Sequence, residues 1–340
     1  MKVGILRGEE NSFPEALIER INQKSAERKL DLTAEFIKIE TVQMAEPCDY
    51  DLIIDRISHD VPFYRAFLKN TALSGTQIIN NPFWWSADDK FFNYSIAHKI
   101  GVPIPKTVLL PHNSHPPSTS SQSMRNLVYP INWSAVFNYV GFPSFLKPHA
   151  GGGWKHVYKI HNEEEFFKCY NQTGTLCMVL QEGIEFTEYY RCYTVGRKHV
   201  HIMRYDPTKA FFAQYVPGNP PPSPALGEKI VQYCLHINNA LGYDLNTCEF
   251  AVRDGIPYAI DFGNPAPDCD IKSVTPENFE WVVEHMSELA IERAQMPKQP
   301  PQEYVWSHFL GSAANPAVAE SKPARKKASG TARRSSAKSA

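Results

Sequence analysis

The sequence pattern with the most chemical content is a lysine that ends an apolar segment and precedes a run of glycines. Residues 142–146 are mostly apolar, Lys147 follows them, and Gly151, Gly152 and Gly153 come shortly after. Glycines let backbone N–H groups approach an anion closely, and a lysine ammonium is a point charge for phosphate. The pattern favours a phosphate-binding loop that folds over its ligand as a lid. A glycine hairpin beside an ordinary surface lysine is the alternative.

Two acids on neighbouring strand-like segments form a second chemical pattern. Glu249 and Asp261 lie on segments joined by a short turn, and Asn264 follows the second segment. Carboxylates and an amide oxygen are the hard ligands that Mg²⁺ prefers. Side-chain alternation predicts that Ile260 and Phe262 face one side of the strand while Asp261 faces the other side with Glu249. The alternative is that both acids simply face solvent.

The elements that must position these residues begin with an alternation of strands and helices in the first eighty residues. Short apolar strand-like runs alternate with helical spacing of apolar residues, which predicts a parallel sheet with helices on its faces. The expected strands are 2–7, 32–39, 50–55 and 77–80, and the expected helices are 14–29 and 62–73. No Gly-x-Gly-x-x-Gly follows the first strand, so the dinucleotide fingerprint is missing here.

The rest of the chain up to about residue 295 also reads as mixed helices and strands. A capping serine and two acids predict that a helix starts at Ser86 and runs to about Ile100. Asn162 and the acids after it predict the start of another helix. The expected strands are 106–110, 144–147, 156–160, 178–181, 189–195, 198–205, 248–253 and 258–262, and the further helices are 166–171, 226–241 and 275–295.

Taken in chain order over residues 86–295, these motifs resemble the ATP-grasp superfamily of ligases. The matching pieces are an early lysine, the lysine and glycine-rich loop, an apolar strand ending in a hinge, and a pair of acids followed by an asparagine. In this sequence they are Lys90, Lys147 to Gly153, Gln181-Glu182-Gly183-Ile184, and Glu249 with Asp261 and Asn264. The layout before Lys90 is similar to that of glutathione-synthetase-like and ribosomal-protein glutamate-ligase-like members.

The resemblance implies an α/β (α+β) protein with three parts. Residues 1–85 would form an N-terminal α/β domain with a parallel sheet. Residues 86–298 would form a two-lobed ATP-grasp domain, with a central lid lobe at about 106–182 and a C-terminal lobe at about 183–298. Residues 299–340 are rich in Pro, Ala, Ser and Lys and are expected to form a disordered tail.

The resemblance also implies where ATP binds. Lys90, Lys147 and the three glycines would contact the phosphates. The adenine pocket would be lined by Gln181, Glu182 and Ile184. Glu188 would bind the ribose hydroxyls, with Glu185 as a competing candidate. The two arginines on the strands flanking Gly196, Arg191 and Arg204, would act on the γ-phosphate or on the acyl phosphate formed from it.

The resemblance further implies a metal site in which Glu249, Asp261 and Asn264 hold one or two Mg²⁺ (or Mn²⁺) ions. The family commonly has acid-x-Asn, whereas two residues separate Asp261 from Asn264 here, which leaves Asp268 as an alternative third ligand. A second departure is Gly183 in the hinge, where a bulkier residue is frequent.

The implied activity is an ATP-dependent carboxylate–amine or carboxylate–thiol ligase that works through an acyl phosphate and releases ADP and phosphate. A small-molecule kinase on the same scaffold and a non-catalytic ATP-binding module are the alternatives. The implied partners are a small carboxylate and a small amine, with a peptide or protein acceptor also open. Arg56, with His59 nearby, is a candidate for holding a substrate carboxylate, and a structural arginine in an ion pair is the alternative.

Composition limits where such a protein works. The net charge is −1, but residues 321–340 hold seven basic residues and no acid, so residues 1–320 carry 28 basic and 36 acidic residues. A basic tail gives weak contact with nucleic acid or another polyanion, or serves only solubility. Seven scattered cysteines, an early charged N-terminus and no long apolar run predict a cytoplasmic protein with reduced thiols.

Overall fold

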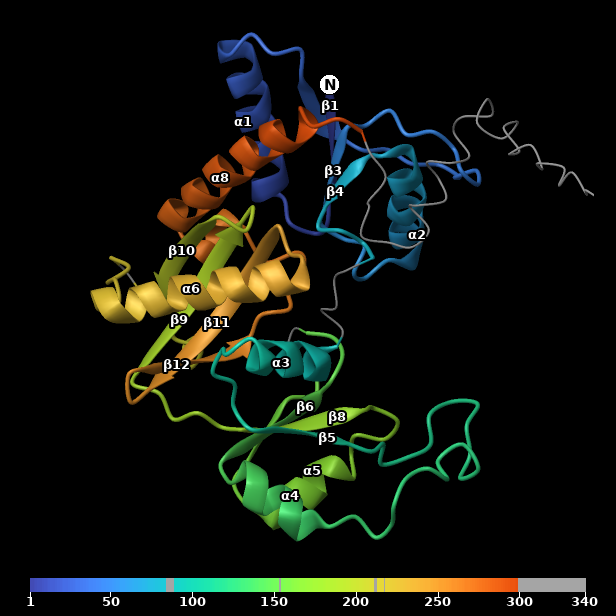
Figure 1. Ribbon diagram of the computed structural model, residues 1–340, viewed down its shortest axis with the longest axis vertical. Coiled ribbons are helices and arrows are strands. Elements are labelled where there is room, and N and C mark those ends of the chain that lie inside the picture. Colours follow the sequence, from blue (N-terminus) through green and yellow to red (C-terminus); the bar gives the residue numbers. More distant parts are fainter. Residues whose placement is uncertain (84–88, 153, 211–212, 217, 299–340) are drawn as a thin grey trace, which may run out of the picture.

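The computed structural model describes residues 1–83, 89–152, 154–210, 213–216 and 218–298. Three four-stranded sheets follow one another along the longest axis of the molecule (Figure 1). The N-terminal sheet lies at one end, the β9–β12 sheet in the middle and the β5–β8 sheet at the other end. Residues 84–88, where the sequence predicts a helix start, and residues 299–340, where it predicts a disordered tail, lie outside the described part.

The N-terminal sheet is parallel throughout, in the order β2-β1-β3-β4, which confirms the prediction from alternating strands and helices. Apolar residues of α1 fill one face and apolar residues of α2 fill the other. The elements are β1 (Lys2–Leu6), α1 (Ser12–Glu27), β2 (Thr33–Phe36), β3 (Leu52–Asp55), α2 (Pro62–Thr71), a 3-10 turn (Ala72–Ser74) and β4 (Gln77–Ile79).

The β5–β8 sheet is antiparallel, in the order β5-β8-β6-β7. Its elements are β5 (Thr107–Leu110), α4 (Trp133–Val140), β6 (Ser144–Pro148), β7 (Tyr158–Ile160), α5 (Glu163–Tyr170) and β8 (Met178–Glu182). Rings of Trp133, Phe137 and Phe166 pack together beneath one face, with centroids 5.0 to 6.2 Å apart. The Asn162 side chain accepts a hydrogen bond from the backbone N–H of Glu165, as the sequence predicts for the start of α5.

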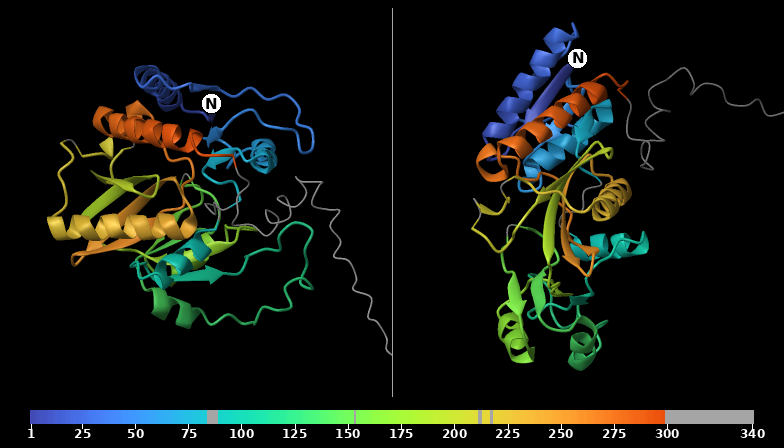
Figure 2. Two further views of the ribbon diagram at one scale, coloured as in Figure 1. Left: turned by 45° about the horizontal axis from the view of Figure 1, so that its top comes forward. Right: turned by 90° about the vertical axis from the view of Figure 1, so that its left-hand side faces the viewer.

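The β9–β12 sheet is antiparallel, in the order β10-β9-β11-β12. Helices α3 and α6 pack on one face, and α8 packs on the other (Figures 1 and 2). The elements are α3 (Lys90–Lys99), β9 (Glu188–Val195), β10 (His199–Arg204), α6 (Pro224–Leu241), β11 (Leu245–Arg253), β12 (Ile256–Asp261), α7 (Ile271–Val274) and α8 (Pro276–Ala294).

Helix α3 begins at Lys90, with Asp89 as its N-cap. The Asp89 carboxylate accepts a hydrogen bond from the backbone N–H of Phe92 at 3.1 Å. Such a cap pairs one of the N–H groups that have no partner within the helix, and it places a negative charge at the positive end of the helix dipole. The expected capping residue, Ser86, lies outside the described part of the chain.

Helix α8 connects the last part of the chain to the first. Its apolar residues belong to the same buried cluster as those of α1, β1 and β3. Helices α1 and α8 lie side by side (Figure 1). Three glutamates of α8 pair at 2.5 to 2.8 Å with three basic residues at and just after the C-terminal half of α1: Glu280 and Glu284 with Arg20, Glu284 and Glu288 with Lys24, and Glu288 with Arg28. The N-terminal sheet is therefore covered in part by a helix, Pro276–Ala294, that comes long after its last strand, Gln77–Ile79.

A buried asparagine holds the N-terminal sheet to the β9–β12 sheet. Asn80, 2% exposed, donates to the carbonyl oxygens of Leu245 and Pro265 at 2.7 and 2.8 Å. Its side-chain oxygen accepts from the N–H groups of Asp244 and Leu245 at 2.7 and 2.9 Å. All four hydrogen bonds that this amide can form are made, so the joint is specific as well as buried.

Candidate functional site

The two acids and the early lysine come together at the edge of the β9–β12 sheet that faces α3. Glu249 on β11 lies directly opposite Asp261 on β12. The Lys90 ammonium, at the N-terminus of α3, lies 2.9 and 3.0 Å from the two Asp261 carboxylate oxygens. Lys90 and Asp261 are 171 residues apart in the sequence, and the packing of α3 against the sheet brings Lys90 to the acid pair.

A register shift in the β11–β12 pair between Glu249 and Phe250 sets the direction of Asp261. Regular alternation would place Ile260 and Phe262 on the same side, as the sequence analysis expects. That expectation is wrong: Ile260 packs against the α8 side of the sheet, and Phe262 packs on the α3 and α6 side. A bulge of this kind reverses the alternation locally and redirects side chains.

Lys147 reaches the same cluster from the β5–β8 sheet. Lys147 is 9% exposed, and its ammonium donates to the Gln181 side-chain oxygen at 2.8 Å and lies 5.1 Å from the centre of the Tyr94 ring. Burial lowers the pKa of Lys147 to about 8; Asp261 opposes this shift, and Lys90 adds to it. Keeping Lys147 protonated in this buried position therefore costs free energy, and a bound phosphate would stabilise the charge.

The acid pair and Arg191 complete the charge cluster. Desolvation raises the pKa of Glu249, and Arg191, 3.8 Å away, only partly offsets it. Desolvation also acts on Asp261, but Lys90 and Lys147 outweigh it and the net effect lowers the pKa of Asp261. Two carboxylates with pKa values moved in opposite directions, beside three cations, are typical of a functional site.

The glycine-rich loop lies next to Lys90. The backbone N–H of Lys90 donates to the carbonyl oxygen of His149 at 2.8 Å. Gly151 has φ +84°, a conformation that favours glycine, and a Cβ at Gly152 would meet no atom within 4 Å among the described residues. These two glycines therefore leave an open backbone segment near the charge cluster, whereas Gly153 lies outside the described residues.

The hinge residues use their side chains within the protein. Gln181 bonds Lys147 and also donates to the Thr107 hydroxyl at 2.9 Å. The Glu182 carboxylate pairs with Arg253 at 2.9 Å. Ile184 is 8% exposed in the core. Since both polar side chains are engaged, Gln181 is placed to orient Lys147 and Glu182 to hold the hinge.

The glycine in the hinge has a steric reason. The Gly183 N–H donates to the carbonyl oxygen of Pro143 at 2.8 Å, and a Cβ on Gly183 would lie 2.7 Å from that same oxygen. A bulkier residue would therefore force Pro143, just before β6, away from the hinge. This close approach accounts for the second departure of the sequence from the ATP-grasp pattern.

The two candidate arginines lie on opposite faces of the β9–β10 pair. Arg191 is opposite Met203 in the register and shares the face of Glu249. Arg204 is on the other face, where it contacts Glu188 at 2.5 Å and the Tyr190 hydroxyl at 2.7 Å. The expectation that both arginines point at one phosphate is therefore not met, because their positions in the strands differ in parity.

Glu188, the candidate for the ribose, is on the Arg204 face. Its carboxylate accepts from the Tyr190 hydroxyl at 2.5 Å, and this bond together with Arg204 lowers the pKa of Glu188. Glu185, the competing candidate, is exposed at the end of the hinge. Neither carboxylate adjoins the acid pair, and the choice between them stays a prediction.

The expected third metal ligand is held by its backbone. The N–H of Asn264 donates to the Asn246 side-chain oxygen at 3.0 Å. The alternative, Asp268, accepts from the N–H of Asp270 at 2.9 Å. Within the described ranges, no three His, Cys, Asp or Glu side chains lie close enough to hold a metal ion together. The carboxylates of Glu249 and Asp261 are therefore the acidic part of the site, and Asp268 does not join them.

Arg56, the candidate for a substrate carboxylate, is buried in the joint between the first and last parts of the chain. It is 4% exposed, and it donates to Glu10 and to the Pro267 carbonyl oxygen, both at 2.5 Å. His59 lies 3.3 Å from Asp60 at the surface. The geometry supports the ion-pair alternative for Arg56, and the structure does not bring His59 to Lys147.

Two residues that contact the cluster were missed by the sequence analysis. The Tyr94 hydroxyl donates to the Ile260 carbonyl oxygen at 3.0 Å, and its ring covers Lys147. The Tyr189 hydroxyl donates to Glu249 at 2.6 Å. Helical spacing marks Tyr94 only as a core residue, and strand alternation with Arg191 is the one signal that points to Tyr189.

A cavity of about 630 Å³ opens beside Tyr189. It is lined by residues that precede and begin β9, that end β10, and that lie in the following loop: Phe186, Thr187, Glu188, Tyr189, Arg204, Tyr205, Asp206, Thr208, Val216, Pro220 and Pro221. Because the Tyr189 hydroxyl bonds Glu249, one wall of this cavity is in contact with the acid pair.

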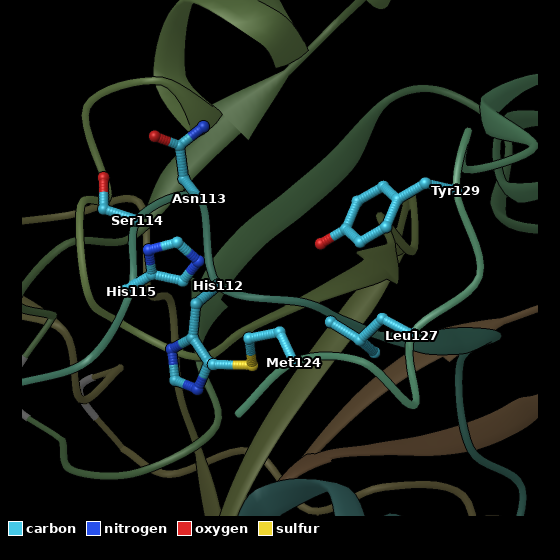
Figure 3. A pocket seen from close by; sticks show the side chains of 7 residues that line it. All are labelled: His112, Asn113, Ser114, His115, Met124, Leu127 and Tyr129. Atoms are coloured by element: carbon cyan, nitrogen blue, oxygen red, sulfur yellow. The ribbon is translucent and has the colours of Figure 1, made fainter. Parts of the chain in front are cut away.

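A second cavity, of about 100 Å³, is far smaller and lies in the loop after β5. Figure 3 shows the side chains around it, including His112, His115 and Met124. Nδ1 of His112 lies 2.9 Å from the Thr175 carbonyl oxygen, and His115 is exposed. None of its lining residues belongs to the charge cluster.

No family model and no curated protein matches the chain by sequence. Solved structures do match it. D-alanine–D-alanine ligase from Bacillus anthracis, complexed with ATP, is 16% identical, with a TM-score of 0.56 over 86% of this chain and 96% of that one. A RimK domain ATP-grasp protein from Sphaerobacter thermophilus is 16% identical, with a TM-score of 0.58 over 86% and 100%.

A third match is N5-carboxyaminoimidazole ribonucleotide synthetase from Thermus thermophilus, 15% identical, with a TM-score of 0.54 over 84% of this chain and 74% of that one. At these identities the likeness concerns the fold. The chain has the ATP-grasp fold, preceded by a parallel α/β sheet, which confirms the fold class inferred from the sequence motifs. The described part contains no helix of the length and apolarity that a bilayer span requires.

Proposed function

We propose that this protein is an ATP-dependent ligase that joins a carboxylate to an amine or a thiol through an acyl phosphate. The observation that supports this most is the convergence of Lys90, Lys147 and Arg191 with the acid pair Glu249 and Asp261. These charges come from both sheets of an ATP-grasp fold, and two structural neighbours are a ligase and a synthetase by their names.

The chemistry requires such a cluster because negative charge approaches negative charge. A carboxylate oxygen attacks the γ-phosphorus of ATP, the bond to the β,γ-bridging oxygen breaks, and ADP leaves. An amine or thiol then attacks the acyl carbon, inorganic phosphate leaves with the bonding electron pair, and the nucleophile loses its proton. Lys90 and Lys147 would offset the charge of the transferring phosphoryl group.

A divalent cation fits the donor set. Glu249 and Asp261 offer carboxylate oxygens on adjacent strands, which suit Mg²⁺ or Mn²⁺, and Asn264 follows β12 as a candidate amide ligand. When bound, the ion would neutralise phosphate charge. Lys90 contacts both oxygens of Asp261, so it would have to turn towards a phosphate when the cation binds.

The test is to incubate the purified full-length protein with ATP, Mg²⁺ and pools of carboxylates and amines. Phosphate release that requires both a carboxylate and a nucleophile supports a ligase. A phosphorylated product without phosphate release identifies a kinase, and ATP binding with no turnover identifies a binding module. If ATP leaves the melting temperature unchanged, the proposal is contradicted, because a bound ligand stabilises the folded state.

Lys147→Ala should lower ATP-dependent product formation by at least about a hundredfold, since it removes a cation aimed at the phosphates. The circular dichroism spectrum should stay unchanged. Lys159→Ala is the matched control, because Lys159 is an exposed lysine on β7 of the same sheet. Equal activity of Lys147→Ala and Lys159→Ala would contradict the assigned role.

A further inference from the structure

Two buried polar atoms beside the acid pair have no hydrogen-bond partner among the described residues. They are Nε of Arg191 and the hydroxyl of Tyr215. Tyr215 is 8% exposed, and the Arg191 side chain is 12% exposed with its nearest acid, Glu249, at 3.8 Å. Burial without a partner costs free energy, so such atoms in a folded protein call for an explanation such as a ligand.

The two atoms belong to one cluster of side chains. The Tyr205 ring lies 5.1 Å from the Tyr215 ring and 5.7 Å from the Arg191 guanidinium carbon. Burial raises the pKa of Tyr215, although Arg191 opposes the shift, so the hydroxyl keeps its proton at neutral pH. Both unpartnered atoms are therefore hydrogen-bond donors, and one of them is cationic, which selects an anion.

The position of this cluster connects the reaction centre to the cavity of about 630 Å³. Tyr205 and Tyr189 line that cavity, and Tyr189 also bonds Glu249. An anion between Arg191 and Tyr215 would thus have the acid pair on one side and the cavity on the other. The volume lies within the range of about 300 to 1,000 Å³ that is usual for small-molecule sites.

We infer that Arg191 and Tyr215 bind the carboxylate group of the acyl donor, and that the cavity holds the rest of that donor. This inference rests on the proposed ligase function. Two donors carrying one positive charge match the two oxygens and single charge of a carboxylate. A triphosphate carries more charge and has Lys90 and Lys147 as its partners, so the Arg191–Tyr215 pair is left for the second anionic substrate.

The experiment measures carboxylate binding by the full-length protein with calorimetry, independently of turnover. The probes are L-glutamate, N-acetyl-L-glutamate, succinate and glutarate, each compared with its neutral amide. Tyr215→Phe removes only the hydroxyl and should raise the dissociation constant of the bound carboxylate at least about tenfold. Tyr170→Phe is the matched control, because Tyr170 is 5% exposed and its hydroxyl donates to Pro111 in the β5–β8 region.

Selective loss of carboxylate affinity in Tyr215→Phe, with ATP affinity unchanged, supports the inference. It is overturned if none of the carboxylates binds the wild type, if Tyr215→Phe binds them equally well, or if ATP affinity falls to the same extent. The two proposals fail separately. If the protein binds a carboxylate through Tyr215 but never binds ATP, the ligase proposal is wrong and the subsite stands. If Tyr215→Phe turns over as fast as the wild type, the subsite is wrong and the ligase proposal stands.

Discussion

At the scale of single residues, Lys147 combines burial with a charge that the chemistry needs. Its lowered pKa of about 8 means that the free folded protein loses this charge as the pH rises through that value. The unfolded chain keeps the proton up to the ordinary lysine pKa of about 10.4. Between these values the unfolded state binds more protons, so Lys147 makes folding more favourable as the pH rises from about 8 to about 10.

ATP binding should therefore take up a proton at alkaline pH. At about pH 9 most of the free protein has a neutral Lys147, and a neighbouring phosphate raises its pKa, so up to about one proton should enter with the ligand. Calorimetry in buffers of different ionisation enthalpy measures this uptake. Lys147→Arg stays charged at both pH values, so at pH 9 its proton uptake should not exceed the uptake of the wild type at about pH 6.5. Equal proton uptake by the variant and the wild type at pH 9 would refute this role for Lys147.

Sequence patterns predicted which residues form the charge cluster better than they predicted the face of the sheet on which each candidate side chain lies. Lys90, Lys147 and Asp261 carry recognisable spacing, and the structure brings them together. Arg204 was grouped with Arg191 because both lie on strands, but their order along two antiparallel strands decides the face, and a one-residue difference reverses it. Tyr215 lies in a loop without periodicity, so no local signal marks it.

At the scale of elements, the segment after β12 is held by two buried asparagines. Asn246 donates to the Phe262 carbonyl oxygen at 2.7 Å and accepts from the Asn264 N–H at 3.0 Å. Asn80 donates a hydrogen bond to the Pro265 carbonyl oxygen. Asn238 of α6 accepts a further bond from Asn246 at 3.0 Å, which fixes the orientation of that amide. The turn that carries Asn264 is thus positioned by three neighbouring elements.

Asn246→Ala should lower the free energy of unfolding by about 1 to 3 kcal/mol, because it leaves buried groups of Phe262 and Asn264 unpaired. Urea denaturation measures this change. Asn239→Ala is the control: Asn239 donates to the carbonyl oxygen four residues earlier in α6 but is exposed, so its effect should stay within about 0.5 kcal/mol. A similar decrease in the free energy of unfolding for both variants would mean that the hydrogen bonds of Asn246 to the turn after β12 add no stability.

The strands and helices followed from hydrophobic periodicity, but the bulge in β11–β12 did not. Side-chain alternation predicts which face a residue occupies only while two paired strands stay in the same register. The shift beside Glu249 breaks that condition, so Ile260 and Phe262 separate although they are two residues apart. The sequence also gives no signal for the hydrogen bonds of Asn80 and Asn246, because these bonds join residues on elements that only the fold brings together.

At the scale of the whole molecule, the ion pairs between α1 and α8 join the ends of the fold. Lys24 is the centre of this network: its side chain is 8% exposed, and it contacts Glu284 and Glu288 at 2.6 and 2.5 Å. Hydrogen bonding to Arg28 lowers the pKa of Glu288 to about 2, with Lys24 contributing and burial opposing. The glutamates are 43% exposed, so solvent screens much of this interaction.

Glu288→Gln should lower stability at neutral pH by no more than about 1 kcal/mol, the usual limit for an exposed ion pair. A carboxyl with a depressed pKa stabilises the fold above its unfolded-state pKa of about 4.3, and the gain disappears as the pH falls towards about 2. Melting temperatures of the variant and the wild type should therefore converge over that window. Glu19→Gln, an exposed position on α1 outside the network, should match the wild type at every pH; divergence of Glu288→Gln at low pH would contradict the assignment.

Helix α8 has one more consequence, which concerns the nascent chain. One face of the first sheet is covered by α1 and by apolar residues of α8, which is made only after residue 275. At a synthesis rate of about 5 to 20 residues per second, roughly 10 to 40 seconds separate the first sheet from the helix that covers it. Until α8 is made, the part of this face that α8 covers stays available to chaperones, and a ribosome that stops before α8 releases a product in which that part is exposed.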